Sequence, residues 1–212
     1  REVLSAISNA KDAMESHPDY SRRWKDSGDW RKEAIAKIYT RYVHRLAEAN
    51  ALDFDDIILH AVTLLQQEGE VRDYYRRKFR YVLIDEYQDT NFAQHSIVLQ
   101  LAKEHRHVCV VGDDAQSIYS FRGADIDNIL YFTKVYPGTK VFKLEQNYRS
   151  TQTIVSAANS LIEKNQRQIR KEVFSEKEKG EAIGVYQAYS DVEEGDIVIN
   201  KIAELRRQGN DA

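Results

Sequence analysis

The sequence predicts an α/β protein in which a parallel sheet with covering helices follows an N-terminal helical segment. In the first part of the chain, apolar residues recur at intervals of three and four, the spacing typical of amphipathic helices. From residue 81 onward, short apolar runs alternate with helical stretches through short connections. This alternation indicates parallel strands, because a covering helix returns the chain to the starting edge of the sheet.

Two amphipathic helices are predicted before the first strand. Residues 31–49 form one of them, since Ile35, Ile38 and Tyr39 begin an apolar stripe with helical spacing. The other begins at Asp53, whose carboxylate can accept hydrogen bonds from backbone amides of the first helical turn. Its apolar stripe consists of Phe54, Ile57, Ile58, Ala61, Val62 and Leu65.

The α/β part contains three predicted strands, YVLID, HVCVV and KVFKL, with helices at about 91–104, 124–134 and 150–165. A further strand is expected in EAIGVYQAYS. A last helix is expected to begin at Asp191, with Glu194 as the second half of a capping box. A domain junction is expected within 134–143, around the sequence YPGTK.

The composition of the chain excludes several classes of protein. Of the 212 residues, 42% are hydrophobic and 31% are charged, and no apolar run approaches the roughly 18 residues that a membrane-spanning helix requires. A single cysteine, Cys109, rules out a disulfide framework and favours a reducing, cytoplasmic location, and the six histidines show no zinc-ligand spacing. The net charge of −3 gives no global argument for nucleic-acid binding but allows a local basic groove.

Acidic residues close the first two predicted strands. The acid pair, Asp85 and Glu86, ends YVLID, and HVCVV leads into GDDAQ, which ends at Gln116. Because ligands of a parallel sheet bind beyond the carboxyl ends of its strands, Asp85 could hold Mg²⁺ and Glu86 could accept a proton from water attacking a γ-phosphate. Gln116 can donate and accept hydrogen bonds, which suits it to sensing a phosphate. Two alternatives stay open: the acid pair only caps the next helix, and GDD is an ordinary turn.

Aromatic residues beside arginines mark two later segments. In SIYSFRGA, Tyr119 and Phe121 precede Arg122, and in LEQNYRST, Tyr148 precedes Arg149. Aromatic rings stack on nucleobases and guanidinium groups pair with phosphates, so both segments are candidates for contact with nucleotide or nucleic acid. The alternatives are core packing for Tyr119 and Phe121, and a solvated strand end for Tyr148 and Arg149.

Four segments together resemble superfamily 1 DNA helicases of the UvrD/PcrA/Rep type. They are DFDD at 53–56, VLIDEYQDTN at 82–91, VVGDDAQSIYSFRGA at 110–124 and LEQNYRST at 144–151. The segments stand in the order of that family, and the resemblance covers essentially the whole chain. It implies an ATP-dependent enzyme that uses Mg²⁺, translocates 3′ to 5′ on single-stranded DNA and unwinds duplex DNA.

The resemblance also implies roles at a nucleotide. Asp85 corresponds to the acid associated with Mg²⁺, Glu86 to the catalytic base, and Gln116 to the γ-phosphate sensor that couples nucleotide to DNA. Tyr148 corresponds to the residue that stacks on adenine. Arg149 corresponds to the arginine that reaches the γ-phosphate across the cleft between two motor domains.

Further roles concern DNA. Tyr119 and Phe121 correspond to aromatic residues that stack on bases of the tracking strand, with Arg122 beside them. The family more often has tryptophan at the position of Phe121. The acids of DFDD also lie in a family motif, but helix capping favours a structural role for them over a catalytic one.

The resemblance divides the chain into part of a helical accessory domain (1–52), the later half of a first RecA-like motor domain (53–140) and the start of a second (141–212). None of the nine glycines is followed by lysine, so the phosphate-binding motif GxxxxGK[ST] is absent. The chain is therefore expected to be an internal fragment that does not hydrolyse ATP by itself. Two rival hypotheses are a non-catalytic helicase-like module that binds DNA or protein, and the helicase subunit of a recombination nuclease complex.

Overall fold

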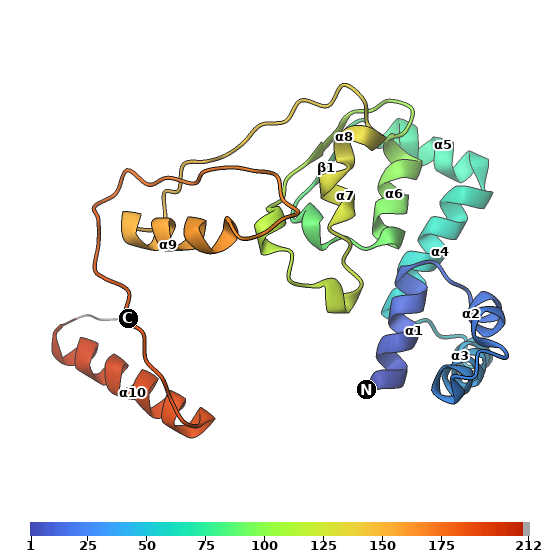
Figure 1. Ribbon diagram of the computed structural model, residues 1–212. Helices are drawn as coiled ribbons and strands as arrows, with labels where there is room; N and C mark the ends of the chain where they lie inside the picture. Colours follow the sequence, from blue (N-terminus) through green and yellow to red (C-terminus); the bar gives the residue numbers. More distant parts are fainter. Residues whose placement is uncertain (210–212) are drawn as a thin grey trace. The chain divides into compact units, whose positions relative to one another are not determined.

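The computed structural model describes residues 1–209, with every side chain except that of Arg122 (Figure 1). The chain divides into two compact units. The first comprises Arg1–Phe142 and Gln166–Arg170, and the second comprises Lys143–Asn165 and the described residues from Lys171 onward.

Helices form the beginning of the first unit. They are α1 Glu2–Asp12, α2 His17–Trp24, α3 Trp30–Glu48, α4 Phe54–Gln67 and α5 Gly69–Lys78. The predicted helices at 31–49 and after Asp53 are confirmed as α3 and α4. The sequence did not predict α5, a short helix that buries none of its residues fully.

A reciprocal cap starts α4, as predicted for Asp53. The Asp53 carboxylate accepts a hydrogen bond from the Asp56 backbone N–H at 2.8 Å, and the Asp56 carboxylate accepts one from the Asp53 backbone N–H at 3.3 Å. The helices α1, α2 and α3 pack around a separate apolar core. Its buried residues are Ile7, Ala10, Tyr20, Ile35, Ala36 and Tyr39.

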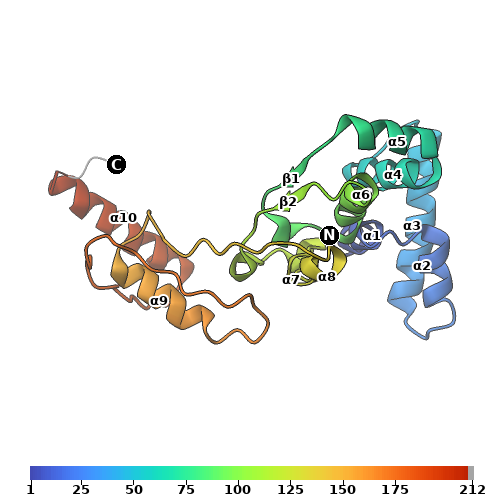
Figure 2. The same ribbon diagram turned by 90° about the horizontal axis from the view of Figure 1, so that it is seen from above.

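The sheet of the first unit is a parallel pair of short strands, β1 Val82–Ile84 and β2 Val108–Val110. The connecting helix α6, Phe92–Ala102, lies beside the strands (Figures 1 and 2). These elements confirm the parallel strands and the helix predicted at 91–104. Leu83 lies opposite Cys109, and both side chains are exposed, so one face of the pair is open.

The other face of the strands packs on a second core, whose buried residues are Tyr87, Val98, Ile129, Phe132 and Tyr136. The helix predicted at 124–134 is instead two short helices, α7 Asp127–Leu130 and α8 Phe132–Val135. Tyr131, with φ −105° and ψ 10°, interrupts the helical backbone. Burial of Ile129 before the break and of Phe132 after it holds both short helices on the same core.

The strand predictions for KVFKL and EAIGVYQAYS are wrong. Residues 140–144 and 181–190 lie outside strands, and Phe142 and Leu144 are 80% and 83% exposed. An apolar run forms a strand only where a neighbour pairs with its backbone, and within the described residues neither run has one. The bridge described in the second unit instead joins Gln146 to Phe174.

The helices of the second unit are α9 Gln152–Ile162 and α10 Asp191–Arg207. The first lies within the predicted range 150–165. The capping box predicted for Asp191 and Glu194 is wrong by one residue. Ser190 has the extended backbone of an N-cap, and its hydroxyl accepts a hydrogen bond from the Glu193 backbone N–H at 3.2 Å.

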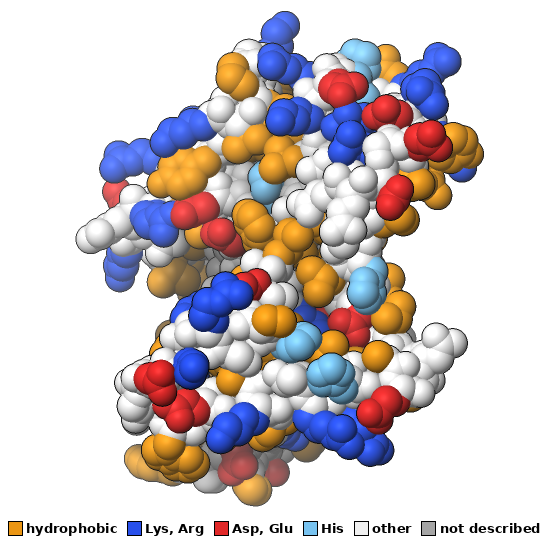
Figure 3. Space-filling model, turned by 90° about the vertical axis from the view of Figure 1, so that its right-hand side faces the viewer, with side chains coloured by type: hydrophobic (Ala, Val, Ile, Leu, Met, Phe, Trp, Pro, Cys, Tyr) orange, Lys and Arg blue, Asp and Glu red, His pale blue; other side chains and the backbone are white. Residues whose placement is uncertain are grey.

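Charges are mixed on the face of the first unit that carries α2 to α5. There, Lys and Arg side chains are interspersed with Asp and Glu, so positive charge is not segregated on that face (Figure 3). Across residues 1–209, none of the helices combines the length and the apolar character needed to cross a membrane.

Candidate functional site

The carboxyl ends of β1 and β2 bring two candidate segments together. Beyond the strands, the Val111 N–H donates to the Ile84 carbonyl at 2.8 Å, and the Tyr87 N–H donates to the Val111 carbonyl at 3.0 Å. These bonds hold the acid pair next to residues 111–117, which we call the β2 loop. The acid pair and Gln116 therefore share the edge of the sheet where ligands of parallel strands bind.

Both carboxylates of the acid pair are exposed. The Asp85 carboxylate accepts a hydrogen bond from the Glu86 N–H at 2.9 Å, and the Glu86 backbone is left-handed, with φ 50° and ψ 41°. That conformation is uncommon for a residue with a Cβ atom and costs about 1–3 kcal/mol. The structure does not support simple capping, because Glu86 makes no side-chain cap to the following turn and α6 is capped by Asn91 through the Gln94 N–H at 2.8 Å.

Tyr87 anchors the turn that follows the acid pair, η1 Tyr87–Asp89. Its side chain is fully buried, edge-on to Phe132 with ring centroids 5.6 Å apart, and its hydroxyl lies 2.6 Å from His95 Nδ1. Burial raises the pKa of Tyr87 and lowers the pKa of His95, although Asp125 opposes the second shift. Both groups are therefore neutral near pH 7. The buried contacts of Tyr87 hold the turn in place and so support the strained backbone of Glu86.

Sequence reasoning missed Gln88, which is 1% exposed and links the acid pair to the β2 loop. Its Nε2 donates to Glu86 Oε2 at 2.8 Å and to Asp89 Oδ2 at 3.3 Å. Its Oε1 accepts from the Asp113 N–H at 3.0 Å. A Cβ atom on Gly112 would lie 2.6 Å from Gln88 Oε1, so this close approach requires glycine.

Gln116 stands at the end of η2 Asp114–Gln116 in the β2 loop and is exposed. Its Nε2 donates to Asp113 Oδ2 at 2.8 Å, while Asp113 Oδ1 accepts from the Ala115 N–H at 3.1 Å. Asp114 is buried and accepts from the Ile169 N–H at 2.9 Å. The two aspartates thus shape the loop, in agreement with the turn alternative for GDD, and Asp113 orients the Gln116 amide.

The aromatic residues after the β2 loop are not core residues. Tyr119 is 38% exposed and Phe121 is 67% exposed, with ring centroids 6.1 Å apart. Phe121 lines a cavity of about 660 Å³ together with side chains of α1, α4 and α6. Gly123 has φ 82°, and a Cβ atom there would lie 2.6 Å from Asp12 Oδ2, so glycine lets this segment approach α1. Arg122 lies in η3 Ser120–Arg122, and its side chain is outside the described residues.

Tyr148 and Arg149 belong to the second unit and have exposed side chains. The Tyr148 hydroxyl donates to Gln146 Oε1 at 2.8 Å. The Arg149 N–H donates to Asn147 Oδ1 at 2.8 Å, and Lys177 Nζ donates to the Arg149 carbonyl at 2.9 Å. These backbone contacts fix the turn and leave the Arg149 guanidinium in solvent.

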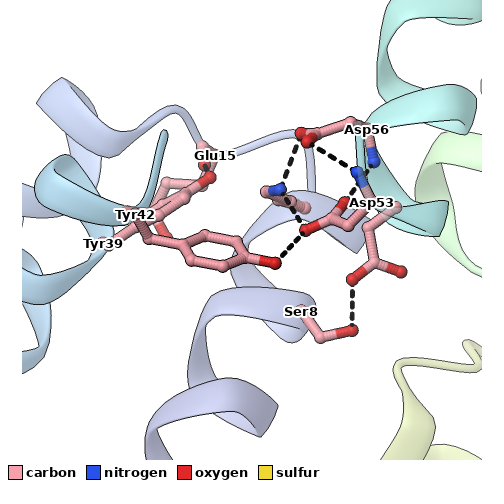
Figure 4. A network of polar contacts seen from close by, with 8 residues as sticks. Ser8, Glu15, Tyr39, Tyr42, Asp53 and Asp56 are labelled. Atoms are coloured by element: carbon pink, nitrogen blue, oxygen red, sulfur yellow. Dashed lines mark hydrogen bonds and ion pairs between the residues drawn. The ribbon is translucent and has the colours of Figure 1, made fainter. Parts of the chain in front are cut away.

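The acids of DFDD join α4 to α1 (Figure 4). The Lys11 side chain is 1% exposed, and its Nζ lies 2.7 Å from Asp53 Oδ2 and 2.6 Å from Asp56 Oδ1. Tyr42 from α3 donates to the same Asp53 oxygen at 2.9 Å. A buried ammonium group is tolerated here because two carboxylates compensate it.

The charges of this network follow from its contacts. Burial alone would raise the pKa of Asp53, but hydrogen bonds from Lys11, the Asp56 backbone and Tyr42 hold that pKa below its ordinary value. Asp55 accepts from the Ser8 hydroxyl at 2.7 Å, again between α4 and α1. The contacts agree with the structural role expected for these acids.

The fit to Mg²⁺ depends on Asp85. Among residues 1–209, no three His, Cys, Asp or Glu side chains are arranged to hold a metal ion. Mg²⁺ that accompanies a nucleotide needs no such cage, since one or two carboxylates, water and phosphate oxygens complete its shell. The exposed Asp85 carboxylate at the end of β1 fits that requirement.

The fold and the edge of the sheet define an α/β protein with an acid pair beside a glutamine-bearing loop, and comparison with known proteins gives the class. Residues 1–137 match the UvrD/REP helicase N-terminal domain, and residues 142–212 match the UvrD-like helicase C-terminal domain. The chain belongs to the UvrD/REP helicase family, which confirms the resemblance carried by its four motifs.

Curated relatives extend the match over the whole chain. It is 42% identical over 209 residues to ATP-dependent DNA helicase PcrA of Staphylococcus aureus and of Bacillus subtilis, and 40% identical to that of Staphylococcus epidermidis. Each match covers 99% of this chain and 28% of the relative. The chain therefore spans just over a quarter of the length of these relatives.

Proposed function

We propose that this chain is part of an ATP-dependent DNA helicase that moves 3′ to 5′ along single-stranded DNA and unwinds duplex DNA. The strongest support is that the acid pair and the β2 loop meet at the carboxyl edge of a parallel strand pair. This meeting occurs in a chain 42% identical to proteins named ATP-dependent DNA helicase PcrA. A nucleotide at that edge would face the side chains that hydrolysis needs.

In this proposal Asp85 would hold Mg²⁺ and Glu86 would act as the general base. Bound Mg²⁺ would neutralise charge on the β- and γ-phosphate oxygens. The Glu86 carboxylate takes a proton from a water molecule while the oxygen of that water bonds to the γ-phosphorus. The bond from phosphorus to the bridging oxygen breaks, and its electron pair stays on ADP. Gln116, oriented by Asp113, hydrogen-bonds to the γ-phosphate.

Two further roles toward the nucleotide are assigned to residues of the second unit. The exposed ring of Tyr148 would stack on adenine, and the exposed guanidinium of Arg149 would neutralise charge on the transferring phosphoryl group. This assignment makes 53–140 the later part of a first RecA-like motor domain, 141–212 the start of a second, and 1–52 part of an accessory domain.

DNA would contact the segment after the β2 loop. Tyr119 and Phe121 are exposed aromatic rings in one short segment, which suits them to stacking on successive bases. Arg122 follows Phe121 directly in the sequence, and its positive charge would pair with a phosphate of the same strand.

Two measurements test the proposal. The full-length protein should hydrolyse ATP when single-stranded DNA is added, and it should separate a duplex with a 3′ single-stranded tail but not one with a 5′ tail. The 212-residue chain should release no more phosphate than a no-protein control, because none of its glycines precedes a lysine that could hold the β- and γ-phosphates. A full-length protein that binds DNA without hydrolysing ATP would favour the non-catalytic module instead.

A further inference from the structure

The buried amide of Gln88 connects three groups from two segments of the chain. Its Nε2 lies 2.8 Å from Glu86 Oε2 and 3.3 Å from Asp89 Oδ2, and its Oε1 lies 3.0 Å from the Asp113 backbone nitrogen. Asp113 is 25 residues further along the chain, in the β2 loop. The contact therefore joins the candidate general base to the loop that carries the candidate phosphate sensor.

The orientation of this amide follows from its partners. The Asp113 N–H can only donate, so the group facing it must be the carbonyl oxygen of Gln88. The carboxylates of Glu86 and Asp89 can only accept when ionised, so the group facing them must be the NH₂. A flipped amide would leave a buried donor and a buried acceptor without partners, which is unfavourable.

The surroundings hold the amide in one position. Gly112 leaves room for Gln88 Oε1 where a Cβ atom would lie 2.6 Å away. The Ser117 hydroxyl donates to the backbone carbonyl of Gln88 at 3.4 Å, which ties the main chain of this residue to the β2 loop. Gln88 is thus a fixed donor, whereas Glu86 is an exposed side chain on a left-handed backbone with φ 50°. The hydrogen bond from Gln88 therefore sets the direction of the Glu86 carboxylate.

We propose that Gln88 is a positioning residue for ATP hydrolysis, which aims the Glu86 carboxylate and ties its position to the β2 loop. The inference rests on the proposed role of Glu86 as general base. Gln88 touches neither water nor nucleotide in this role and exchanges no proton. Misplacing a catalytic group by about 1 Å can cost on the order of 100-fold in rate, so loss of the contact should lower kcat by about 10- to 100-fold.

Gln88→Glu is the decisive variant, because it separates the two halves of the amide. The new side chain has nearly the same shape and keeps an oxygen that can accept from Asp113, but it offers no NH₂ to Glu86. If Gln88 only braces the β2 loop, this variant should keep wild-type turnover. If Gln88 aims Glu86, kcat should fall about 10- to 100-fold while KM for ATP changes less than about threefold. Gln67→Glu adds the same charge at an exposed position of α4 and serves as the matched control.

Gln88→Met removes both the carbonyl oxygen and the NH₂ group of the side chain. Hydrogen exchange of the Asp113 backbone amide reports on the β2 loop without measuring activity. Exchange at Asp113 should stay slow in Gln88→Glu and become faster in Gln88→Met, while both variants lose turnover. Glu86→Gln in the same full-length protein distinguishes the proposed general-base role of Glu86 from the positioning role of Gln88. Normal turnover in Glu86→Gln would defeat the proposed function. An inactive Glu86→Gln together with wild-type kcat in Gln88→Glu would defeat only the positioning role.

Discussion

Replacing Lys11 with methionine should strongly destabilise the first unit. The Lys11 side chain is 1% exposed, and its Nζ lies within 2.7 Å of oxygens of Asp53 and Asp56. Methionine has a similar volume but leaves the two carboxylates without their cation, at side-chain exposures of 23% and 11%. Removing one partner of a buried ion pair costs about 3–5 kcal/mol, and the partial exposure of Asp53 favours the lower end of that range.

Thermal unfolding of the 212-residue chain, followed by far-UV circular dichroism at pH 7.5, measures this effect. A loss of 1 kcal/mol lowers Tm by roughly 2–4 °C at this size, so Lys11→Met should lower Tm by about 6–12 °C. Arg41→Met is the control, because it removes an exposed pair whose atoms, Arg41 Nη1 and Glu48 Oε1, lie 3.8 Å apart. Such surface pairs contribute about 0–1 kcal/mol, so the control should shift Tm little.

The effect of Lys11→Met should also depend on pH. The network lowers the pKa of Asp53 against the opposing effect of burial. A carboxyl group with a lowered folded pKa stabilises the fold above its unfolded pKa and loses that contribution as pH falls through the folded pKa. The difference in Tm should therefore be full at pH 7.5 and shrink below about pH 4. A Lys11→Met protein with the wild-type Tm at pH 7.5 would refute the stabilising role of the buried ion pair. A difference in Tm that does not change with pH would refute it as well.

Three further predictions concern other sites. Asp12→Asn should raise Tm at pH 7.5 but not at pH 4, because burial, aided by Asp55, raises the pKa of Asp12 to about 6. A carboxyl group whose pKa is raised in the folded state stabilises the fold at low pH and loses that contribution as pH rises through the folded pKa. Equal Tm values for wild type and Asp12→Asn at pH 7.5 would contradict the prediction. Phe121→Ala should weaken single-stranded DNA binding about 5- to 100-fold by fluorescence anisotropy, and Phe121→Trp should preserve it; unchanged affinity in Phe121→Ala would exclude stacking. In the full-length protein, Arg149→Ala and Arg149→Lys should both abolish DNA-stimulated ATPase and leave DNA binding intact, because lysine lacks the planar fork. A lysine variant that unwinds DNA would contradict the role of Arg149.

Local patterns predicted the elements whose stability is local. The stripe of α3 and the cap of α4 at Asp53 are visible in the sequence, because helix contacts connect residues three or four apart. Strands depend on distant partners. The runs at 82–84 and 108–110 pair with each other, whereas KVFKL also contains strand-forming apolar residues but has no neighbour to pair with among the described residues.

The candidate site shows the same difference between local sequence signals and contacts with distant residues. The acid pair and Gln116 were found because each follows an apolar run, and sequence order alone places them at one edge of a parallel sheet. Gln88 carried no such signal, since its role depends on a contact with Asp113, 25 residues away. Lys11 was missed for the same reason. Its partner Asp53 lies 42 residues away, and burial of a lysine cannot be read from a polar helix.

The most direct test of ATP hydrolysis at this edge is the turnover of Glu86→Gln in the full-length protein. The amide keeps the size of the side chain but cannot take a proton, and general-base catalysis contributes about 10²–10⁴-fold in rate. With saturating ATP and single-stranded DNA, kcat should fall at least about 100-fold, while nucleotide affinity stays within a few-fold. Glu70→Gln, the same change at an exposed position of α5, should leave turnover unchanged. Near-normal turnover in Glu86→Gln would mean that the acid pair is not the hydrolytic centre.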